Sequence, residues 1–446
     1  MALTGIEIFK MLPKTNCKEC GFPTCLAFAM ALASGKAELD ACPYVSEEVK
    51  EKLAEASAPP IRPIKLGPKD ATKTIGGETV QFRHEKTFFN PTIIAGRLKT
   101  SMSDAEVDAQ LKQFMALQFE RVGLNLRPEM FVIVDTDGDA GKFTALVKKV
   151  MDGSDALILL RSENADVLKA GAEVAKERRP ILAPATPENA DAMGALAKEL
   201  DLPLVAKAEG YDALAELTTK LTGMGLKDLI LDSGARNLKQ VFQDNVVFRR
   251  AALVPKFKPF GFPVLNCVAE MTDDPVKQAL YASVAIAKYG GIVVLSDLTP
   301  DVVFPLLLQR LNIYTDPQKP MIVTQGIYPI NNPDENSPIV ITTNFALTYF
   351  IVSGEIEGSK VPTWLMIMDT EGLSVMTAWA AGKFVGDAVG MFVKKSGIDE
   401  KAKTRSLIIP GYAAAISGDL EEELPDWKIL IGPREASHIP AFLKSQ

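Results

Sequence analysis

The chain has 446 residues, of which 47% are hydrophobic and 24% charged, and this size and balance predict a globular protein of about three domains. The net charge of -7 argues against a nucleic-acid-binding surface, because phosphate binding needs a basic footprint. No apolar run reaches the length of about 18 residues that a membrane span needs, and the first residues lack the apolar core of a secretory signal. We therefore expect a cytoplasmic protein that binds neither membrane nor nucleic acid.

Four of the five cysteines lie in the first tenth of the chain, at Cys17, Cys20, Cys25 and Cys42. One CxxC pair followed by a third cysteine differs from the two matched pairs that are usual in four-thiolate zinc sites. Cys42 precedes Pro43, as the last cysteine does in bacterial ferredoxin runs. In a reducing compartment such thiols bind metals more often than they form disulfides. The spacing favours a 4Fe-4S cluster, with structural zinc and free thiols as the alternatives.

Two short helical patterns accompany these cysteines, at residues 24–35 and 46–56, and we take residues 1–57 as one small domain. The next segment is rich in proline, with Pro59, Pro60, Pro63 and Pro68. Proline at this density blocks both helices and strand ladders, so residues 58–90 are predicted to be an extended linker. Such a linker would let the small domain move relative to the rest of the chain.

Residues 91–316 contain eight short β-rich apolar runs, most of them followed by a helical pattern. The runs lie at 92–96, 131–135, 156–160, 180–185, 203–208, 228–234, 262–268 and 291–297. This alternation indicates parallel strands covered by helices. It favours a (β/α)8 barrel, and an open doubly wound sheet remains the alternative. Cys267 lies inside one of these runs and is expected to be a buried core residue.

Acidic residues follow two of these strands, namely Asp135 and Asp137 after one and Asp232 after another. One interpretation is the rim of a barrel active site, for example an embedded pterin methyltransferase. The other is a scaffold barrel in which the acids cap helices, and we favour this second interpretation because a fold does not imply a function.

Residues 317–446 are predicted to form a further α/β unit with strands at 338–343, 363–369, 406–411 and 427–432 and a long helix within 372–397. The loops after these strands are rich in Gly, Ser and Thr, and ligands of parallel sheets bind beyond the carboxyl ends of the strands. The chain has only two histidines and lacks a GxGxxG or Walker A motif. We therefore expect a bound cofactor, rather than side chains, to be the reactive group.

Several motifs resemble one known family. They are "NCKECGFPTCLAFA" together with Cys42, and in the last third "TTNFALTYFIVSGEIE", "MDTEGLSVMTAWAAGKF" and "PGYAAAISGDLEEELPDWKILIGPREASHIP". From end to end the chain resembles the large (gamma) subunit of the corrinoid iron-sulfur protein of the reductive acetyl-CoA (Wood-Ljungdahl) pathway. The resemblance implies a 4Fe-4S domain at 1–57, a TIM-like barrel at 91–316 and a Rossmann/flavodoxin-like corrinoid (cobalamin)-binding domain at 317–446.

The function implied by the resemblance is methyl carriage by a corrinoid-dependent methyltransferase component. A separate methyltetrahydrofolate:corrinoid methyltransferase would load the methyl group, and methyl-Co(III) would deliver it to acetyl-CoA synthase. The 4Fe-4S cluster would reactivate Co(II) to Co(I). A small subunit forming a heterodimer and a reductive activator complete the implied partners. The alternatives are an iron-sulfur electron-transfer adaptor without a corrinoid, and an autonomous methyltransferase that uses its own barrel.

The resemblance also implies corrinoid contacts in the loops of the last domain. These are Thr343, Asn344, Ala346, Thr370, Glu371, Gly372, Leu373, Ser374, Thr377, Gly411, Tyr412, Gly432, Pro433 and Ala436. Ser374 or Thr377 would face the lower side of the cobalt. Many corrinoid proteins carry D-x-H-x-x-G, whose histidine ligates cobalt, but the loop Asp369–Gly372 has no histidine. We expect a base-off corrinoid without a histidine ligand, in which Co(II) is easier to reduce, and a packing or surface role for His438.

Overall fold

The computed structural model describes residues 5–33, 37, 39–46, 49, 59–121, 124–316, 318 and 320–446. The chain divides into two compact units. The first contains Met1–Gln81, Phe89–Phe114 and Glu129–Leu306, and the second contains Phe82–Phe88, Met115–Pro128 and Leu307–Gln446. In the part of the chain that is described, no helix is long and apolar enough to cross a membrane.

The cysteine-rich segment is built on two packed helices, α1 (Gly5–Met11) and α2 (Cys25–Ala33), followed by the short 3-10 helix η1 (Leu39–Ala41). Thr24 begins α2, because its hydroxyl accepts a hydrogen bond from the N–H of Ala27 at 3.1 Å. The expected helix at 24–35 is therefore present. The one expected at 46–56 lies almost wholly outside the described residues.

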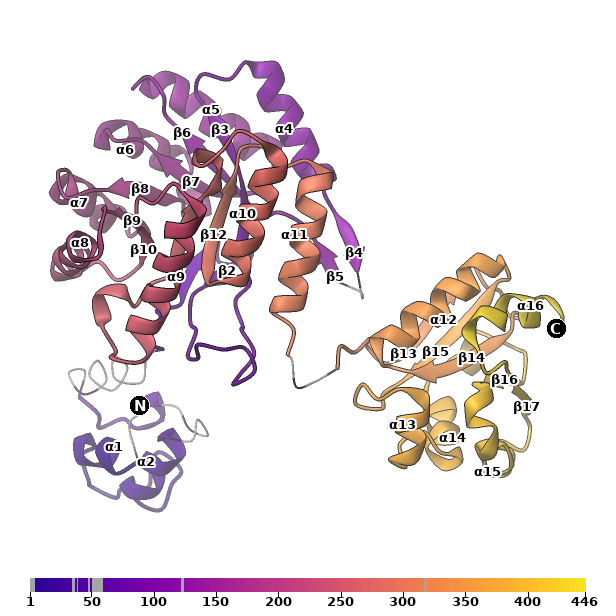
Figure 1. Cartoon of the computed structure of the whole chain (residues 1–446). Coiled ribbons are helices and arrows are strands. Elements are labelled where there is room, and N and C mark those ends of the chain that lie inside the picture. Colours follow the sequence, from indigo (N-terminus) through magenta and orange to yellow (C-terminus); the bar gives the residue numbers. More distant parts are fainter. Residues whose placement is uncertain are drawn as a thin grey trace. The chain divides into compact units, whose positions relative to one another are not determined.

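A closed barrel of eight parallel strands forms most of the first unit and confirms the predicted (β/α)8 architecture (Figure 1). The strands are β3 (Ile93–Lys99), β6 (Met130–Val134), β7 (Leu157–Arg161), β8 (Ile181–Ala185), β9 (Leu204–Lys207), β10 (Leu229–Asp232), β11 (Val264–Cys267) and β12 (Gly290–Leu295). Each overlaps one of the eight apolar runs.

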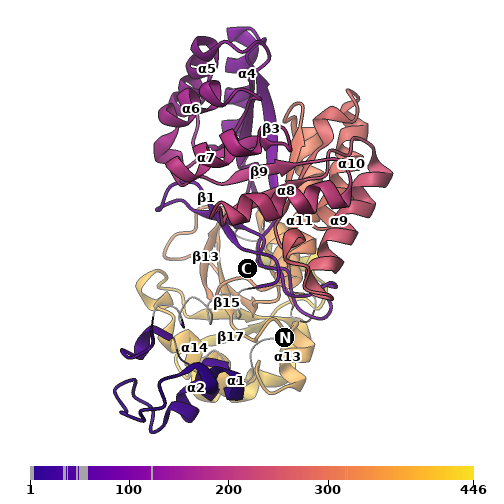
Figure 2. The same cartoon turned by 90° about the vertical axis from the view of Figure 1, so that its left-hand side faces the viewer.

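Among the described residues, eight helices surround these strands (Figures 1 and 2). They are α4 (Asp104–Ala116), α5 (Ala140–Gly153), α6 (Ala165–Val174), α7 (Ala190–Leu200), α8 (Tyr211–Gly223), α9 (Leu238–Leu253), α10 (Pro275–Ala287) and α11 (Pro300–Ile313). Short 3-10 turns supplement them at η2 (Lys176–Arg178), η3 (Lys258–Phe260) and η4 (Val268–Glu270). The last helix, α11, continues into the second unit.

A small hairpin packs into the core of the barrel. Its antiparallel strands β1 (Ile64–Leu66) and β2 (Lys73–Ile75) bury Ile64, Leu66 and Ile75 in the same apolar cluster as the inward-facing residues of the barrel strands. A polar contact also holds the segment, since Arg62 lies 3.3 Å from a carboxylate oxygen of Asp228.

The prediction of an extended linker at 58–90 is therefore wrong for this hairpin. Residue 58 lies outside the described residues. Pro59, Pro60 and Pro63 precede β1, and Pro68 lies between β1 and β2. Proline excluded a helix and a central strand, as argued, but it is compatible with a short edge hairpin. Burial of three branched side chains then fixes the segment on the barrel.

The second unit contains a five-stranded sheet in the order β13-β15-β14-β16-β17. The strands β14 (Ile339–Thr343), β15 (Thr363–Met368), β16 (Ser406–Ile409) and β17 (Lys428–Ile431) are parallel, and the edge strand β13 (Gly326–Ile330) is antiparallel. The four parallel strands match the four predicted. The antiparallel edge strand was not predicted.

Helices cover both faces of this sheet (Figure 1). Residues of α12 (Ala346–Ser359) and α16 (Ile439–Lys444) pack on one face, with Val340, Leu365 and Ile408 of the strands. The other face carries α13 (Val375–Ala380), α14 (Gly386–Lys395) and α15 (Ser417–Glu423). The 3-10 turns η5 (Ile398–Glu400), η6 (Gly411–Ile416) and η7 (Ala436–His438) complete the unit.

The strand order changes direction within this sheet, because β15 lies on one side of β14 and β16 lies on the other. The helix after β14 lies on one face and the helix after β16 lies on the other, although the two strands are neighbours. Such a reversal separates two loops and opens a crevice at the carboxyl end of a parallel sheet. The long helix expected within 372–397 is in fact two helices, α13 and α14, separated by a turn in which Gly382 adopts a φ of +71°.

A second hairpin, β4 (Phe119–Arg121) and β5 (Leu124–Leu126), belongs to the second unit although it lies between α4 and β6 in the chain. The guanidinium of Arg121 lies 5.0 Å from the ring centroid of Phe350 in α12. A cation–π contact of this kind ties the hairpin to the C-terminal sheet domain.

Candidate functional site

Four loops come together at the carboxyl edge of the C-terminal sheet, as the sequence predicted. They follow β14, β15, β16 and β17, and contacts join them in pairs. Asn344 after β14 is bonded to the loop after β15. The N–H of Gly411 after β16 donates to the carbonyl of Pro433 after β17 at 3.2 Å. This edge is the candidate site for a ligand.

Asn344 organises the first pair of loops. It is 1% exposed, and its Oδ1 accepts hydrogen bonds from the N–H groups of Thr370 and Gly372, both at 3.0 Å. Its Nδ2 donates to Asp369 at 2.8 Å. The amide of Asn344 thus shapes the loop through its oxygen and one of its two N–H donors. Ala346 is similarly committed, because its N–H donates to the carbonyl of Met321 at 2.9 Å.

The segment Asp369–Gly372 forms a tight turn. Glu371 and Gly372 have φ values of +56° and +76°, in the left-handed region that suits glycine. A Cβ at Gly372 would lie 2.6 Å from the side chain of Ile322, so this position also has no room for a larger residue. The carboxylate of Glu371 forms an ion pair with Lys383. The Thr370 hydroxyl donates to the carbonyl of Leu373 at 2.9 Å.

Ser374 and Thr377 lie at the start of α13, where Ser374 is the residue that precedes the helix. Their hydroxyl oxygens are 3.1 Å apart and share a hydrogen bond. Thr377 is exposed and Ser374 is partly exposed. Both hydroxyls are therefore accessible at the edge of the sheet, next to the Asp369–Gly372 turn.

The second pair of loops is packed backbone against backbone. A Cβ at Gly411 would lie 2.5 Å from the carbonyl oxygen of Gly432, and one at Gly432 would lie 2.9 Å from that of Ile409. Loop packing alone therefore explains both glycines. Tyr412 is exposed, and its hydroxyl donates to Glu435 at 3.0 Å. This hydrogen bond and the nearby negative charge raise the pKa of Tyr412. Pro433 and Ala436 are partly exposed in the same loop.

Two observations fit a large, partly apolar cofactor at this edge. The hydroxyl oxygens of Thr342 and Thr343, the last two residues of β14, are buried and have no hydrogen-bond partner among the described residues. A buried polar atom without a partner is costly and suggests a missing one. Large apolar side chains are also exposed around the loops, at Ile322, Met376 and Trp379. Apolar surface of this kind is normally covered by a ligand or partner.

Three of the four cysteines of the N-terminal segment belong to one apolar cluster, and the first of the four lies outside it. Cys25 and Cys42 are buried, Cys20 is partly exposed and packs against them, and Cys17 is exposed. The hydrogen bond from Tyr44 to Glu19 raises the tyrosine pKa.

The loop that carries the first three cysteines has an irregular backbone. Lys14, Asn16, Lys18 and Gly21 all have positive φ, so the chain changes direction several times within this loop. The N–H of Asn16 points at the sulfur of Cys25 at 3.4 Å, and such N–H contacts tune the sulfurs of iron-sulfur sites. Within the described ranges, no three Cys, His, Asp or Glu side chains form a group ready to hold a metal ion. The four thiols are suitable ligands for an iron-sulfur cluster, but the described side chains are not arranged as a metal-binding group.

The acids of the barrel rim are engaged inside the protein. Asp135 accepts a hydrogen bond from the Ser162 hydroxyl at 2.7 Å and Asp137 pairs with Lys142 at 2.8 Å. Asp232 forms an ion pair with Arg236. His438 is exposed and lies just before α16. Cys267 is buried in the barrel core, as predicted.

Some residues of the sheet edge were not predicted from the sequence. Lys383, Ile322 and Trp379 lie outside the Gly-rich loops, and only their contacts or exposure in the fold draw attention to them. Trp379 offered one weak signal, since the chain has only three tryptophans and this one lies a few residues after a loop.

Comparisons with known proteins cover the whole chain. The family model described as CO dehydrogenase/acetyl-CoA synthase delta subunit matches residues 63–443, and a model for an Fe-S cluster matches residues 12–44. The corrinoid/iron-sulfur protein large subunit of Moorella thermoacetica is 42% identical over 445 residues, which are 100% of this chain and 99% of that protein. The acetyl-CoA decarbonylase/synthase complex subunit gamma of Methanopyrus kandleri is 36% identical over 455 residues, covering 100% of this chain and 98% of that protein.

Among solved structures, dihydropteroate synthase from Thermus thermophilus aligns with 12% identity and a TM-score of 0.39, covering 56% of this chain and 100% of that chain. A score this low supports no inference about function.

Proposed function

Because the chain belongs to the family of corrinoid/iron-sulfur protein large subunits and acetyl-CoA decarbonylase/synthase gamma subunits, we propose that it is a methyl carrier in acetyl-CoA synthesis. The carrier receives a methyl group from methyltetrahydrofolate through a separate methyltransferase and passes it to acetyl-CoA synthase. The observation that carries the proposal is the 42% identity over the full length to a corrinoid/iron-sulfur protein large subunit.

The C-terminal sheet domain, of Rossmann or flavodoxin type, is proposed to hold a cobalamin-type corrinoid at its four-loop edge. A bound corrinoid supplies a cobalt that accepts and donates methyl groups. The unpartnered hydroxyl of Thr343 and the partly exposed hydroxyls of Ser374 and Thr377 offer hydrogen bonds to its polar groups. Asn344 and Thr370 hold the turn between them in a fixed shape.

The same turn is proposed to leave the cobalt without a histidine ligand. Glu371 stands two residues after Asp369, where D-x-H-x-x-G has its histidine. Its carboxylate forms an ion pair with Lys383. Ser374 or Thr377 is the group proposed to face the lower side of the cobalt, and a weak oxygen neighbour of this kind leaves Co(II) easy to reduce.

The cysteine segment is proposed to bind one 4Fe-4S cluster through Cys17, Cys20, Cys25 and Cys42 and to return the corrinoid to its active reduced state. Soft thiolates suit such a cluster, and the apolar helix α2 shields two of them from water. The proposed domain limits are 1–57 for the cluster domain, 91–316 for the barrel and 317–446 for the corrinoid domain.

The partners proposed for this function are a small subunit that forms a heterodimer, the methyltransferase, acetyl-CoA synthase and a reductive activator. All of them would meet the chain in the cytoplasm.

A single-turnover experiment tests the proposal. The chain is produced with its small subunit, loaded with corrinoid and reduced under anaerobic conditions. It is then mixed with methyltetrahydrofolate, with and without the separate methyltransferase. Methyl transfer that requires the added methyltransferase supports the carrier. Transfer without it would assign the reaction to the chain's own barrel, and no transfer in either case would refute methyl carriage.

A further inference from the structure

Four inward-facing side chains at the carboxyl end of the barrel are cationic, among neutral ones such as Val134 and Ser296. Ile93, Ala95, Leu157, Leu159, Val205 and Ile230 belong to the barrel core. Since side chains alternate along a strand, the inward positions that follow them are Arg97 and Lys99 on β3, Arg161 on β7, Lys207 on β9 and Asp232 on β10. These positions carry four cationic side chains and one acidic side chain. The carboxyl end of the barrel is where (β/α)8 enzymes bind their substrates.

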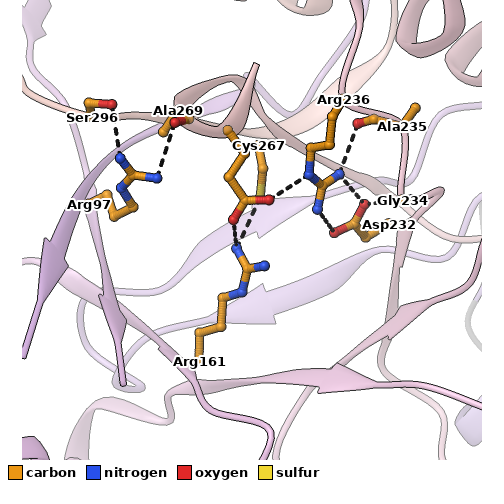
Figure 3. Close-up of polar contacts among 10 residues, drawn as sticks. Arg97, Arg161, Asp232, Gly234, Ala235, Arg236, Cys267, Ala269 and Ser296 are labelled. Carbon is orange, nitrogen blue, oxygen red and sulfur yellow. Dashed lines mark hydrogen bonds and ion pairs between the residues drawn. The ribbon is translucent and has the colours of Figure 1, made fainter. Parts of the chain in front are cut away.

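Two further charged residues reach the same place from loops, and they form a chain of ion pairs (Figure 3). Arg161 and Arg236 both bind the carboxylate of Glu270, and Arg236 also holds both oxygens of Asp232 at 3.1 Å. Burial alone would raise the pKa of Glu270, but the two arginines outweigh it and hold this pKa below its usual value. Glu270 therefore remains ionised, and the ion pairs of Glu270 and Asp232 engage only two arginines, Arg161 and Arg236.

Cys267 adds no negative charge to this cluster. Its sulfur lies 3.8 Å from Arg161, but burial raises the pKa of the thiol to about 12, so the thiol stays protonated. Its neutral sulfur therefore only accepts a weak hydrogen bond from the guanidinium.

The remaining cations have no acidic partner within the described ranges. Arg97 donates only to neutral oxygens, the carbonyl of Ala269 at 3.1 Å and the hydroxyl of Ser296 at 3.2 Å (Figure 3). The ammonium groups of Lys99 and Lys207 have no ion pair with any described acid. A guanidinium has five N–H donors, so Arg97 keeps donors for a ligand, and its two anchors fix its position.

We propose that the carboxyl end of the barrel binds a small dianion, a phosphate group or a dicarboxylate, at the anchored guanidinium of Arg97, with Lys207 on the opposite side of the ring adding positive charge. The side chains of Arg161 and Arg236 are 20% and 24% exposed, so the cluster is recessed yet open to solvent. A recessed cluster inside a ring of strands suits a small molecule better than a flat protein surface. A dianion there would balance the uncompensated positive charge and would take bidentate hydrogen bonds from a preorganised guanidinium.

Isothermal titration calorimetry on the full chain tests this site, at low ionic strength so that charges are little screened. The probes are inorganic phosphate and succinate, which represent the two chemistries. The variants are Arg97→Met and Lys207→Met. The matched control is Lys148→Met, which removes the same charge from an exposed position on α5, away from the barrel interior. Lys207 has no protein partner to leave unpaired, so its variant is expected to fold even if Arg97→Met does not.

We expect saturable binding of one probe molecule per chain with a dissociation constant below about 1 mM. Either site variant should weaken it at least about tenfold, and the control should not change it. Stronger binding of phosphate or of succinate identifies the chemistry. No saturable binding of either probe, or an equal loss in Lys148→Met, would overturn the proposal. The outcome is independent of corrinoid loading and of methyl transfer.

Discussion

Asn344 and Thr370 are joined by a hydrogen bond, because Oδ1 of Asn344 accepts from the N–H of Thr370 at 3.0 Å. The Thr370 hydroxyl, which donates to Leu373, lies 3.1 Å from the same oxygen. The two residues follow neighbouring strands of the C-terminal sheet, β14 and β15. One buried amide thereby fixes the turn on which the proposed corrinoid site depends. The first prediction concerns this amide.

Asn344→Ala is expected to destabilise the second unit by about 1–3 kcal/mol, since it leaves buried N–H groups of Thr370 and Gly372 without acceptors. Denaturant unfolding of the full chain measures the loss. Asn336→Ala, at an exposed position of the same unit, is the control and should be neutral. Equal unfolding of both variants would mean that Asn344 does not hold the turn.

Ile64→Ala tests the hairpin that replaces part of the expected linker. Ile64 is 0% exposed within the barrel core, so the cavity left by the substitution should cost about 2–5 kcal/mol. Urea unfolding gives the value, and the exposed neighbour Lys65→Ala should behave like the parent chain. Unchanged stability of Ile64→Ala would restore the picture of a loose linker.

Glu270→Gln should change how stability depends on pH. Arg161 and Arg236 lower the pKa of Glu270 in the folded chain below 4.5, so the ionised carboxylate stabilises the fold above that pH. This stabilisation is lost as the pH falls through the folded pKa. The variant should therefore be less stable than the parent near neutral pH, and the difference should shrink in acid. The difference is read from unfolding midpoints between about pH 3 and 7.

A difference that does not vary with pH would contradict this account of Glu270. Glu173→Gln, at an exposed position on α6 without an arginine partner, serves as the control and should follow the parent chain at every pH.

The variants Cys42→Ser and Cys267→Ser distinguish a proposed cluster ligand from a cysteine of the barrel core. The first should reduce the iron content and the visible absorption of the anaerobically purified chain, because it removes one of the four proposed thiolates. The second should keep both, since Cys267 lies in the barrel core. Iron retained in Cys42→Ser, or lost equally in both, would refute the proposed ligand set.

Glu371→His would place a histidine at the position where D-x-H-x-x-G carries its cobalt ligand. We expect nitrogen splitting in the Co(II) electron paramagnetic resonance spectrum and a more negative Co(II)/Co(I) potential, because an axial nitrogen donor stabilises Co(II). Glu371→Gln also breaks the pair with Lys383 but adds no imidazole, and it should show neither change. An unchanged spectrum in Glu371→His would mean that this turn does not face the cobalt.

The barrel was predictable because its signal is local. Each of its strands is a near-continuous apolar run followed by a helical pattern, and parallel pairing inside a helical shell requires that composition. The hairpin of β1 and β2 was not predicted, because its sequence signal is not local. Ile64, Leu66 and Ile75 alternate with polar residues over strands of three residues each, and the surrounding prolines dominated the pattern. This hairpin is held by the burial of its side chains in the barrel core, and a short stretch of sequence does not contain that information.

The candidate site was predictable at the level of loops and not of individual roles. Parallel strands bring their carboxyl ends to one edge, so the Gly-rich loops had to meet. The contact of Asn344 with a ligand stays a prediction, and its role in holding a neighbouring loop was not predicted. Gly411 is required by the backbone of Gly432, and Gly432 by the backbone of Ile409. These roles depend on distances between loops far apart in the chain.

The most direct test of the central claim is an anaerobic metal count, with an electron paramagnetic resonance spectrum, on the chain produced with its small subunit and corrinoid. The account predicts about four irons and one cobalt per chain, and a Co(II) signal without nitrogen splitting from an axial base. Iron without cobalt would contradict the methyl carrier and leave an iron-sulfur electron-transfer adaptor.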